Sequence, residues 1–353
     1  MKIVVDCRYL RVGRHDGISR YTAGIVTALA RLHPVEVLVD DERQLDHLPG
    51  GLPWHLVSGP TSWREPFVAR QVRRTGADVV FSPMQTMGTW GRDYRVVLTL
   101  HDLIYYRHPT PPRNLPAPVR LLWRLFHLAW WPQRLLLNRA DAVVTVSETT
   151  RDLIAHHRLT RRPVTVVPNA SDPVPTLPGG RSEGSRTRSL VYMGSFMPYK
   201  NVELPVRAMA QLPGWELHLM SPVTPEHRVR LTELAGTGTL VFHDGASDEV
   251  YRDVLGSATA LVSGSRDEGF GLPLVEAMAL GTPLVVSDIP VFREVGGDAG
   301  AYVDPDDVTG FVAAVRELDD AETWAERSTA AQVRAAFYDW DASAKKLLAL
   351  LVG

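Results

Sequence analysis

The feature that most constrains the fold of this 353-residue chain is a regular alternation of short apolar runs with longer helical patterns. The first series of runs lies at 2–6, 35–40, 78–83, 95–102, 141–147 and 163–169. Helical patterns follow several of these runs, for example at 17–32 and 147–159. Short runs rich in Val, Leu and Ile are typical of buried parallel strands. The alternation therefore predicts βαβ units and a doubly wound α/β sheet.

The segment PNASDPVPTLPGGRSEGSRTR (168–188) interrupts this series. It contains four prolines together with Gly, Ser and Arg and has no hydrophobic period, so we interpret 171–188 as a linker. A second series of apolar runs lies at 189–195, 215–221, 239–245, 259–265 and 282–288. One or two amphipathic helices are expected in the last stretch, 322–351.

We therefore predict two domains, at 1–170 and 189–337, each long enough to bury its own core. A C-terminal helix at about 338–353 is expected to pack back on the first domain. Two α/β halves joined by a proline-rich linker imply a cleft between them. Ligands of open α/β sheets bind beyond the carboxyl ends of the strands, so the strand-end loops of both halves should face this cleft.

Charge and cysteine content narrow the classes of function. The formal net charge is −2, which argues against a dedicated nucleic-acid binder. The single cysteine, Cys7, excludes an intramolecular disulfide framework and fits a reducing compartment, and its apolar neighbours predict a buried side chain. The N-terminal sequence MKIVVDCRYL reads directly into a strand without a signal-peptide layout, and no run of about 18 apolar residues predicts a membrane span. We expect a cytoplasmic protein.

The stretch SRDEGFGLPLVEAMALGTP (265–283) carries the clearest chemical signal. Gly269 and Gly271 permit unusual backbone angles and close approach of a ligand. A helix is expected to begin near Pro273, because proline is favoured at the first helical position. The N–H groups from Phe270 to Leu274 would then point outward at the positive end of the helix dipole and form an anion site.

Two glutamates flank this predicted anion site. Glu268 precedes it, and Glu276 is expected in the first turn of the helix. Ionised carboxylates accept hydrogen bonds and pair well with sugar hydroxyls. A ligand whose phosphates bind at the helix terminus and whose hydroxyls pair with acids on both sides would be a sugar nucleotide. The alternative is that Glu276 only favours the helix N-terminus and Glu268 is a solvated turn residue.

These residues resemble the donor-binding region of glycosyltransferase family 4, a large group of retaining enzymes with the GT-B fold. The resemblance rests on EGFGLPLVEAMALGTPLVVSD followed by REVGGDAGAYVDPDD, in which Glu268 and Glu276 match the Glu-x7-Glu hallmark of the family. Further segments fall in the expected order, namely VDCRYL, GISRYT, LTLHDLIYYRHP, ADAVVTVSETTRDLI, VVPNAS and YMGSFMPYKNVE. The resemblance implies two Rossmann-like domains that face a central cleft, an acceptor-side domain at 1–170 and a nucleotide-sugar-binding domain at 189–337.

The resemblance also implies roles for individual residues. Glu276 would hold the ribose hydroxyls, Glu268 the transferred sugar, and Lys200 in PYKN would neutralise the donor diphosphate. Without the resemblance, Lys200 reads equally as an exposed loop lysine. The donor-binding set implied by the resemblance and the strand-end pattern is Gly17, Ile18, Ser195, Lys200, Gly245, Glu268, Gly269, Phe270, Gly271, Leu272 and Glu276.

In the first domain, His101 in LTLHD matches the family histidine that lies near the donor sugar and acceptor. On its own it reads equally as a hydrogen-bonded core histidine, and Asp102 either orients the imidazole or caps the next turn. The loop from Gly13 to Ile18 would bring backbone N–H groups to the phosphates, and it lacks the Gly-x-Gly-x-x-Gly fingerprint of nicotinamide enzymes. The loop 243–247 resembles the part of the family that contacts the base through its backbone.

The sequence departs from the family pattern at two places. Many members carry an arginine shortly before the lysine in a Gly-Arg pair, whereas this chain has Gly194-Ser195. This difference predicts a weaker phosphate site or help from another arginine. The approach to the first glutamate usually contains Pro-Ser, whereas here it reads Gly264-Ser265-Arg266-Asp267, so Arg266 and Asp267 are candidates to alter the choice of sugar.

For the reaction, the resemblance implies retaining transfer by front-face attack, in which the donor phosphate accepts the proton and neither a metal nor a protein nucleophile is needed. His101, Glu268 and Lys200 are the expected catalytic residues. GDP-mannose is the first expectation for the donor, because VDCRYL, GISRY and YKN look most like bacterial mannosyltransferases of surface polysaccharide assembly. UDP-glucose or UDP-N-acetylglucosamine stays open. Rival readings are a sugar-nucleotide 2-epimerase and a non-catalytic sugar-nucleotide-binding protein on the same fold.

The acceptor side offers one clue, the segment RNLPAPVRLLWRLFHLAWWPQRLLLNR (113–139). Between Pro118 and Pro132, a helix would place Arg120, Arg124 and His127 on one stripe, with Leu, Phe and Trp around the rest. Such a helix is too short to span a bilayer but suited to lie in its interface, so 118–132 is a candidate peripheral contact with the inner face of a membrane, which fits a lipid-linked acceptor. The alternative is a helix packed on the first sheet with arginines reaching solvent, which we favour for most of its surface.

Overall fold

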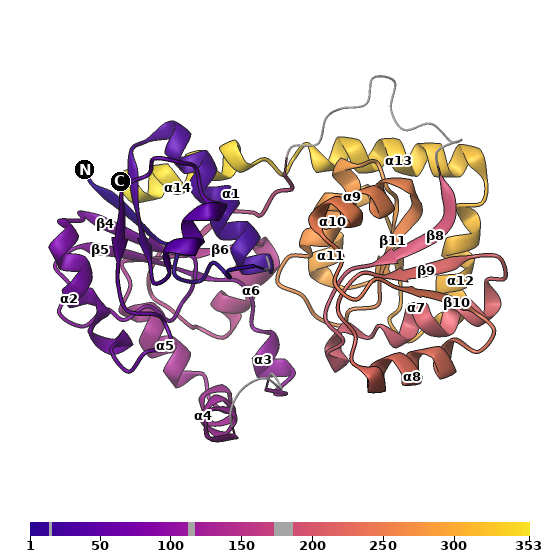
Figure 1. The fold of residues 1–353 in the computed structure, drawn as a ribbon, viewed down its shortest axis with the longest axis horizontal. Coiled ribbons are helices and arrows are strands. Elements are labelled where there is room, and N and C mark those ends of the chain that lie inside the picture. Colours follow the sequence, from indigo (N-terminus) through magenta and orange to yellow (C-terminus); the bar gives the residue numbers. More distant parts are fainter. Residues whose placement is uncertain (14–15, 112–116, 173–185) are drawn as a thin grey trace. The chain divides into compact units, whose positions relative to one another are not determined.

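The computed structural model describes residues 1–13, 16–111, 117–172 and 186–353, and these form two compact units. Unit 1 comprises Met1–Ala170 together with Asp339–Gly353, and unit 2 comprises Ser171–Tyr338. Figure 1 shows a sheet flanked by helices in each unit. Most of the predicted linker, residues 173–185, lies outside the described residues.

The sheet of unit 1 has seven parallel strands in the order β3-β2-β1-β4-β5-β6-β7. The strands are β1 Ile3–Asp6, β2 Val35–Val39, β3 Trp54–Leu56, β4 Val79–Ser82, β5 Arg95–Leu100, β6 Ala142–Thr145 and β7 Val164–Val166. All six predicted runs form strands here. The strand β3 was not predicted. It is an edge strand of three residues whose Trp54 and Leu56 side chains are exposed, so it lacks the continuous apolar run of a buried strand.

The helices of unit 1 are α1 Gly17–Leu32, α2 Val68–Val72, α3 Ile104–Arg107, α4 Ala117–His127, α5 Trp131–Asn138, α6 Glu148–His156 and α14 Trp340–Val352. The C-terminal helix α14 packs against α1 within this unit. Gly24 of α1 makes this contact possible, because a Cβ atom there would lie 2.3 Å from the Trp340 ring. Cys7 is fully buried, as predicted.

The sheet of unit 2 has six parallel strands in the order β10-β9-β8-β11-β12-β13. The strands are β8 Thr187–Tyr192, β9 Glu216–Leu219, β10 Thr239–Phe242, β11 Ala258–Ser263, β12 Leu284–Ser287 and β13 Gly300–Val303. The five predicted runs are all present. The sixth strand, β13, was missed because it begins with glycine and is only partly buried at its centre.

The helices of unit 2 are α7 Glu203–Ala208, α8 Pro225–Ala235, α9 Asp248–Ser257, α10 Leu272–Ala279, α11 Pro290–Gly296, α12 Val308–Glu317 and α13 Ala321–Ala335. Apolar side chains from both the strands and α7, α8 and α12 form the main core on one side of the sheet. Trp324 of α13 is fully buried in this core, and its indole N–H donates to the Thr259 carbonyl at 3.0 Å. The C-terminal stretch therefore contains two helices, α13 and α14, that belong to different units.

One predicted element is wrong in detail. The helix expected between Pro118 and Pro132 ends at His127, and a new helix, α5, begins at Trp131. Pro132 occupies the first turn of α5, where the missing N–H of proline costs nothing. The break therefore separates the arginine stripe on α4 from Trp131 and the residues that follow.

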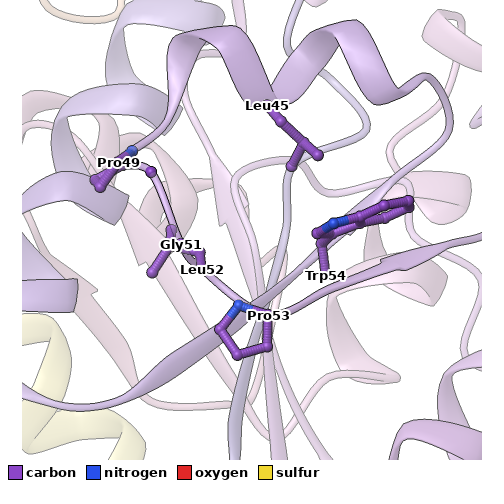
Figure 2. Close-up of a pocket in the computed structure, with 7 residues that line it drawn as sticks. Leu45, Pro49, Gly51, Leu52, Pro53 and Trp54 are labelled. Atoms are coloured by element: carbon purple, nitrogen blue, oxygen red, sulfur yellow. The ribbon is translucent and has the colours of Figure 1, made fainter.

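A shallow pocket of about 480 Å³ lies beside the edge strand β3 (Figure 2). Its lining is almost entirely apolar and consists of Leu45, Pro49, Gly50, Gly51, Leu52, Pro53 and Trp54. No residue predicted to bind or transform a ligand lines this pocket, and its lining contains no charged side chain.

Candidate functional site

In unit 2, Lys200 and Glu268 meet at the carboxyl ends of β8 and β11, two neighbouring strands. The Lys200 Nζ atom lies 2.6 Å from Glu268 Oε1, and the Ser265 hydroxyl donates to the same oxygen at 2.8 Å. The two charged side chains are 18% and 13% exposed, so the pair is shielded but still accessible. Lys200 is thus not the exposed loop lysine of the alternative reading.

Asn201 holds Lys200 in place. Lys200 ends the 3-10 helix η5 (Pro198–Lys200), and Asn201 follows with φ of +43°, in the left-handed region that asparagine tolerates better than most residues. The buried Asn201 amide donates to the carbonyls of Gly264 at 3.0 Å and Pro305 at 2.8 Å. It thereby ties the Lys200 loop to the loops that follow β11 and β13.

The glycine-rich turn leads into α10 as predicted, one residue before Pro273. Gly271 caps the helix with φ of +95°, and a Cβ atom there would lie 2.9 Å from the Phe292 ring. Of the two glycines, Gly271 alone adopts a positive φ. The Leu274 N–H already donates to the Gly271 carbonyl at 2.9 Å, which removes one donor from the predicted anion site.

Phe270 and Leu272 of this turn differ in the burial of their side chains. The Phe270 side chain is buried and meets the Tyr338 ring edge to face at 5.4 Å, so only its backbone is available to a ligand. Leu272 is the first residue of α10, and its side chain is half-buried. The turn therefore presents backbone rather than side-chain chemistry.

The expectation that Glu276 lies in the first turn of the helix is wrong. It is the fifth residue of α10, and the first turn contains no acidic residue. Its half-buried carboxylate accepts a hydrogen bond from the buried Tyr251 hydroxyl of α9 at 3.0 Å, which fixes its direction. The alternative that Glu276 only favours the helix N-terminus is thereby weakened, because the helix-dipole effect falls off within the first turn.

The loop 243–247 follows β10 and contains Gly245 with φ of +93°. The N–H groups of Gly245 and Ala246 both donate to the Met220 carbonyl, and the His243 N–H donates to Leu219. The Ser247 hydroxyl accepts from the Val250 N–H and caps α9. Most backbone donors of this loop are therefore in use, which leaves its carbonyl oxygens as the groups that can accept from a base.

The residues at which the sequence departs from the family pattern have clear partners. Ser195 is exposed, and its carbonyl accepts from the buried Tyr192 hydroxyl at 2.9 Å. Arg266 forms a surface ion pair with Asp306, including a contact of 2.9 Å, and its N–H donates to the Tyr199 carbonyl. Asp267 is buried. Burial of Asp267 argues against a direct contact with a sugar.

In unit 1, His101 follows β5 and is held by a carbonyl. Its Nε2 atom lies 2.7 Å from the Pro83 oxygen, which can only accept, so Nε2 carries the proton and Nδ1 is the acceptor of the neutral ring. The Tyr21 ring of α1 contacts the imidazole edge to face at 5.0 Å. Burial lowers the pKa of His101, which keeps the ring neutral near pH 7.

Of the two roles predicted for Asp102, the structure supports the cap of the next turn. The Asp102 carboxylate accepts from the Ile104 N–H at 3.0 Å, at the turn that begins α3. At the start of α1, the Asp16 carboxylate caps the helix by accepting from the Ser19 N–H at 2.9 Å. Gly17 and Ile18 begin this helix, so the expected N-terminal anion site carries its own carboxylate. Arg11 offsets that charge by pairing with Asp16 at 2.8 Å. Residues 14 and 15 of this loop lie outside the described residues.

The predicted residues therefore form two groups. Lys200, Glu268, Gly269, Gly271 and Glu276 lie on strand-end loops or on α10 of unit 2, while His101, Gly17 and Ile18 belong to unit 1. The residues that position these groups were not predicted, namely Ser265, Asn201, Tyr251 and Tyr21. Their partners lie far along the chain or in another element, so no local pattern marked them. Within the described ranges, no group of three or more His, Cys, Asp or Glu side chains is placed to hold a metal ion.

Comparison with solved structures defines the class of fold. Sucrose-phosphate synthase from Thermosynechococcus elongatus superposes with a TM-score of 0.74 at 20% identity, covering 99% of this chain and 98% of that one. HepE from Anabaena, solved in complex with UDP and glucose, superposes with a TM-score of 0.74 at 17% identity, covering 100% and 99%. WaaG, a glycosyltransferase involved in lipopolysaccharide biosynthesis, gives a TM-score of 0.71 at 18% identity. The fold is GT-B, as predicted.

Two family models match the chain, Glycosyltransferase Family 4 over residues 15–174 and Glycosyl transferases group 1 over residues 187–320. The chain belongs to the family 4 glycosyltransferases. It is 30% identical over 241 residues to the D-inositol 3-phosphate glycosyltransferase of Corynebacterium diphtheriae, covering 61% of this chain and 56% of that one. It is 28% identical over 261 residues to the O-antigen chain mannosyltransferase B of Escherichia coli, covering 67% and 64%.

The matched segments thus span less than two-thirds of the length of these curated relatives. Among the described residues, no helix has both the length and the apolar character required to cross a bilayer.

Proposed function

We propose that the protein is a retaining hexosyltransferase that moves a hexose from a sugar nucleotide to a glycan or lipid-linked acceptor on the cytoplasmic side of a membrane. The observation that carries this proposal is the accessible Lys200–Glu268 pair beside the glycine-capped N-terminus of α10. GDP-mannose is the proposed donor. Names of relatives favour it, because O-antigen chain mannosyltransferases of Salmonella typhimurium and Escherichia coli are 28% identical to the chain.

Glu268, Glu276 and Lys200 would each hold a different part of the sugar nucleotide. Both hydrogen bonds to Glu268 fall on Oε1, and no described residue donates to Oε2 in the structure, so this oxygen can accept from a sugar hydroxyl. A diphosphate bound near Lys200 would place a second anion, in addition to the Glu268 carboxylate, beside the Lys200 ammonium group. The Lys200 charge then stabilises the negative charge that grows on the leaving diphosphate as the glycosidic bond breaks.

The remaining steps need no metal in this proposal. The acceptor hydroxyl attacks the anomeric carbon from the face that the diphosphate leaves, and its proton passes to a phosphate oxygen of the leaving group. His101 is neutral with Nδ1 as its acceptor atom, so it can receive a hydrogen bond from a donor or acceptor hydroxyl without adding charge. Glu276, directed by Tyr251, would accept from the ribose hydroxyls.

A UDP-sugar is the alternative donor, and the similarity in fold to HepE, solved with UDP-glucose, favours it. The loop 243–247 supports both bases, because its available carbonyls accept from an N–H of guanine or of uracil. The donor must therefore be decided by binding.

A thermal-shift panel tests the proposal. GDP, UDP, ADP and their common sugar conjugates are compared on the parent, on Lys200→Ala and on Lys346→Ala, a control at an exposed lysine of α14. A ligand at about a hundred times its dissociation constant adds roughly 2.7 kcal/mol of stability. We expect one nucleotide to stabilise the parent and Lys346→Ala equally and Lys200→Ala much less. No shift with any nucleotide would remove the donor-site assignment.

Incubation with the stabilising sugar nucleotide then separates transfer from the rival activities. Transfer to an acceptor with retention of the anomeric configuration, unchanged by a chelator, is the expected result. Consumption of the donor to a 2-epimer without any acceptor would identify an epimerase. Binding without turnover would identify a non-catalytic sugar-nucleotide-binding protein.

A further inference from the structure

The helix α4 is attached to unit 1 through an aromatic cluster on one of its faces. Trp123 and His127 of α4 contact Tyr105 and Tyr106 of α3 at ring distances between 4.9 and 5.8 Å. Trp130, in the turn after α4, stacks on Tyr106 at 4.0 Å and on His157 at 4.1 Å. These contacts fix which face of α4 is turned inward, and Figure 1 shows the helix beside α3 and α5 at the end of its unit.

The opposite face of α4 exposes a dense group of large apolar side chains. Leu121 and Leu125 are four residues apart and share one face of α4, and Leu128 follows directly after the helix ends. Leu122 beside them is 65% exposed, Leu128 is 75% exposed, and Trp131 at the start of α5 is 65% exposed. We call these five side chains the leucine–tryptophan surface. Such a concentration within eleven residues is unusual on a water-facing surface and marks a contact site.

The charges of the segment that carries this surface all have one sign. Residues 103–140 contain six arginines and no aspartate or glutamate, whereas the whole chain has a net charge of −2. Arg120 and Arg124 follow the same helical spacing and flank the leucines on α4. A symmetric contact between two copies would bring this surface against itself and oppose like charges. An anionic surface offers the complementary charge.

We propose that the leucine–tryptophan surface and the flanking arginines dock unit 1 on an anionic phospholipid bilayer, with the leucines and Trp131 in the interface and the arginines at headgroup depth. An α4 of 11 residues is too short to span a bilayer but has the amphipathic pattern of a helix that lies in its plane. Trp130 takes no part, because both of its stacking contacts, with Tyr106 and His157, are made within unit 1. This inference goes beyond the proposed transfer reaction and does not depend on the donor.

Vesicle flotation with the full chain tests the proposal, using phosphatidylcholine vesicles with and without phosphatidylglycerol. We expect binding only to the anionic vesicles, with an affinity that falls as salt rises. Leu121→Gln/Leu125→Gln should reduce it by at least about tenfold, because it removes buried apolar area. Arg120→Gln/Arg124→Gln should reduce it roughly thirtyfold, at about fivefold for each basic residue near an anionic surface. Arg120→Lys/Arg124→Lys keeps the charge and should keep the binding.

The matched control is Leu56→Gln/Val333→Gln, which removes two side chains of similar exposure from other elements and should leave binding unchanged. Failure of the parent to bind anionic vesicles overturns the proposal, as does full binding by the leucine variant. A dimer that the leucine variant abolishes would assign the surface to a second copy instead. Thermal shifts by sugar nucleotides on the same variants report unit 2 separately, so a failed donor assignment is distinguishable from a failed docking surface.

Discussion

After the first strand of each sheet, a basic side chain meets carboxylates, and the two arrangements differ in their contact with solvent. In unit 1, Arg8 follows β1 and lies between Asp6 at 2.8 Å and Glu65 at 2.6 Å, with Arg8 and Asp6 fully buried. In unit 2, Lys200 follows β8 and meets Glu268 at 2.6 Å, with both side chains partly exposed. The same position in the fold therefore carries two different kinds of charged group.

The number of filled hydrogen-bonding positions explains the difference. Arg8 also donates to the Ser58 carbonyl, and Glu65 also accepts from the Gly88 N–H. Burial acts to lower the pKa of Arg8, but the Asp6 and Glu65 carboxylates outweigh burial, and the net effect is a raised pKa. Burial also raises the pKa of Glu65. A network in which each charged group already has several partners fixes loops and has no capacity for a ligand. Lys200, with one carboxylate partner and access to solvent, keeps that capacity.

The largest effect is expected for Arg8→Ala. The substitution leaves the fully buried Asp6 carboxylate, together with Glu65, without its cation, and breaking a buried pair in this way costs about 3–5 kcal/mol. Urea denaturation of the parent and the variant measures the loss. The control is Arg73→Ala, which removes a surface pair with Asp93 and should change the free energy of unfolding little. A loss below about 1 kcal/mol for Arg8→Ala would show that water reaches this network.

The next effect concerns turnover rather than folding. Lys200→Ala removes the charge that stabilises the leaving diphosphate, and loss of one such group lowers kcat by roughly 10²–10³. Its stability in urea should fall less than that of Arg8→Ala, because it leaves no fully buried carboxylate such as Asp6 without its partner. Equal damage to folding and turnover would place Lys200 with Arg8 as a structural cation and would erase the contrast between the two units.

The sequence predicted the architecture because buried parallel strands leave a strong local signal. The runs at β1 and β12 contain consecutive buried apolar residues, whereas the edge strands β3 and β13 are partly exposed and gave no such signal. The Glu268–Glu276 spacing and Lys200 were predicted from the resemblance to a family. Asn201 was not, because its hydrogen bonds join residues 63 and 104 positions apart, and no local pattern encodes a contact across that distance.

Asn201 gives a smaller and more specific test, as a positioning residue for Lys200. Asn201→Ala removes both amide hydrogen bonds, and Asn201→Gly removes them while keeping the freedom to adopt positive φ. We expect kcat to fall about tenfold in both, since a small misplacement of a reacting group has a large effect on rate. Recovery of full kcat in Asn201→Gly would show that backbone conformation, and not the two hydrogen bonds, places the lysine.

The smallest effect is expected from acid, and it involves histidines of both units. Burial lowers the pKa of His101 in unit 1 and of His218 and His243 in unit 2 below the ordinary value of 6.5. Below that value the unfolded chain binds protons that the folded chain does not, so stability falls as the pH drops towards the folded pKa values and is level above 6.5.

Melting temperatures from about pH 7.5 to about pH 5.5 measure this slope. His218 and His243 share one hydrogen bond of 3.0 Å between ring nitrogens, which only a proton on one of the two can form. Protonation of both rings removes that bond and sets two cations side by side, so His243→Gln should flatten the slope more than His101→Gln does. The Pro83 carbonyl can still accept from a charged His101, so its bond survives acid. An equal slope of melting temperature against pH in the two variants would mean that burial alone, rather than the shared proton, makes the loop 243–247 of unit 2 sensitive to acid.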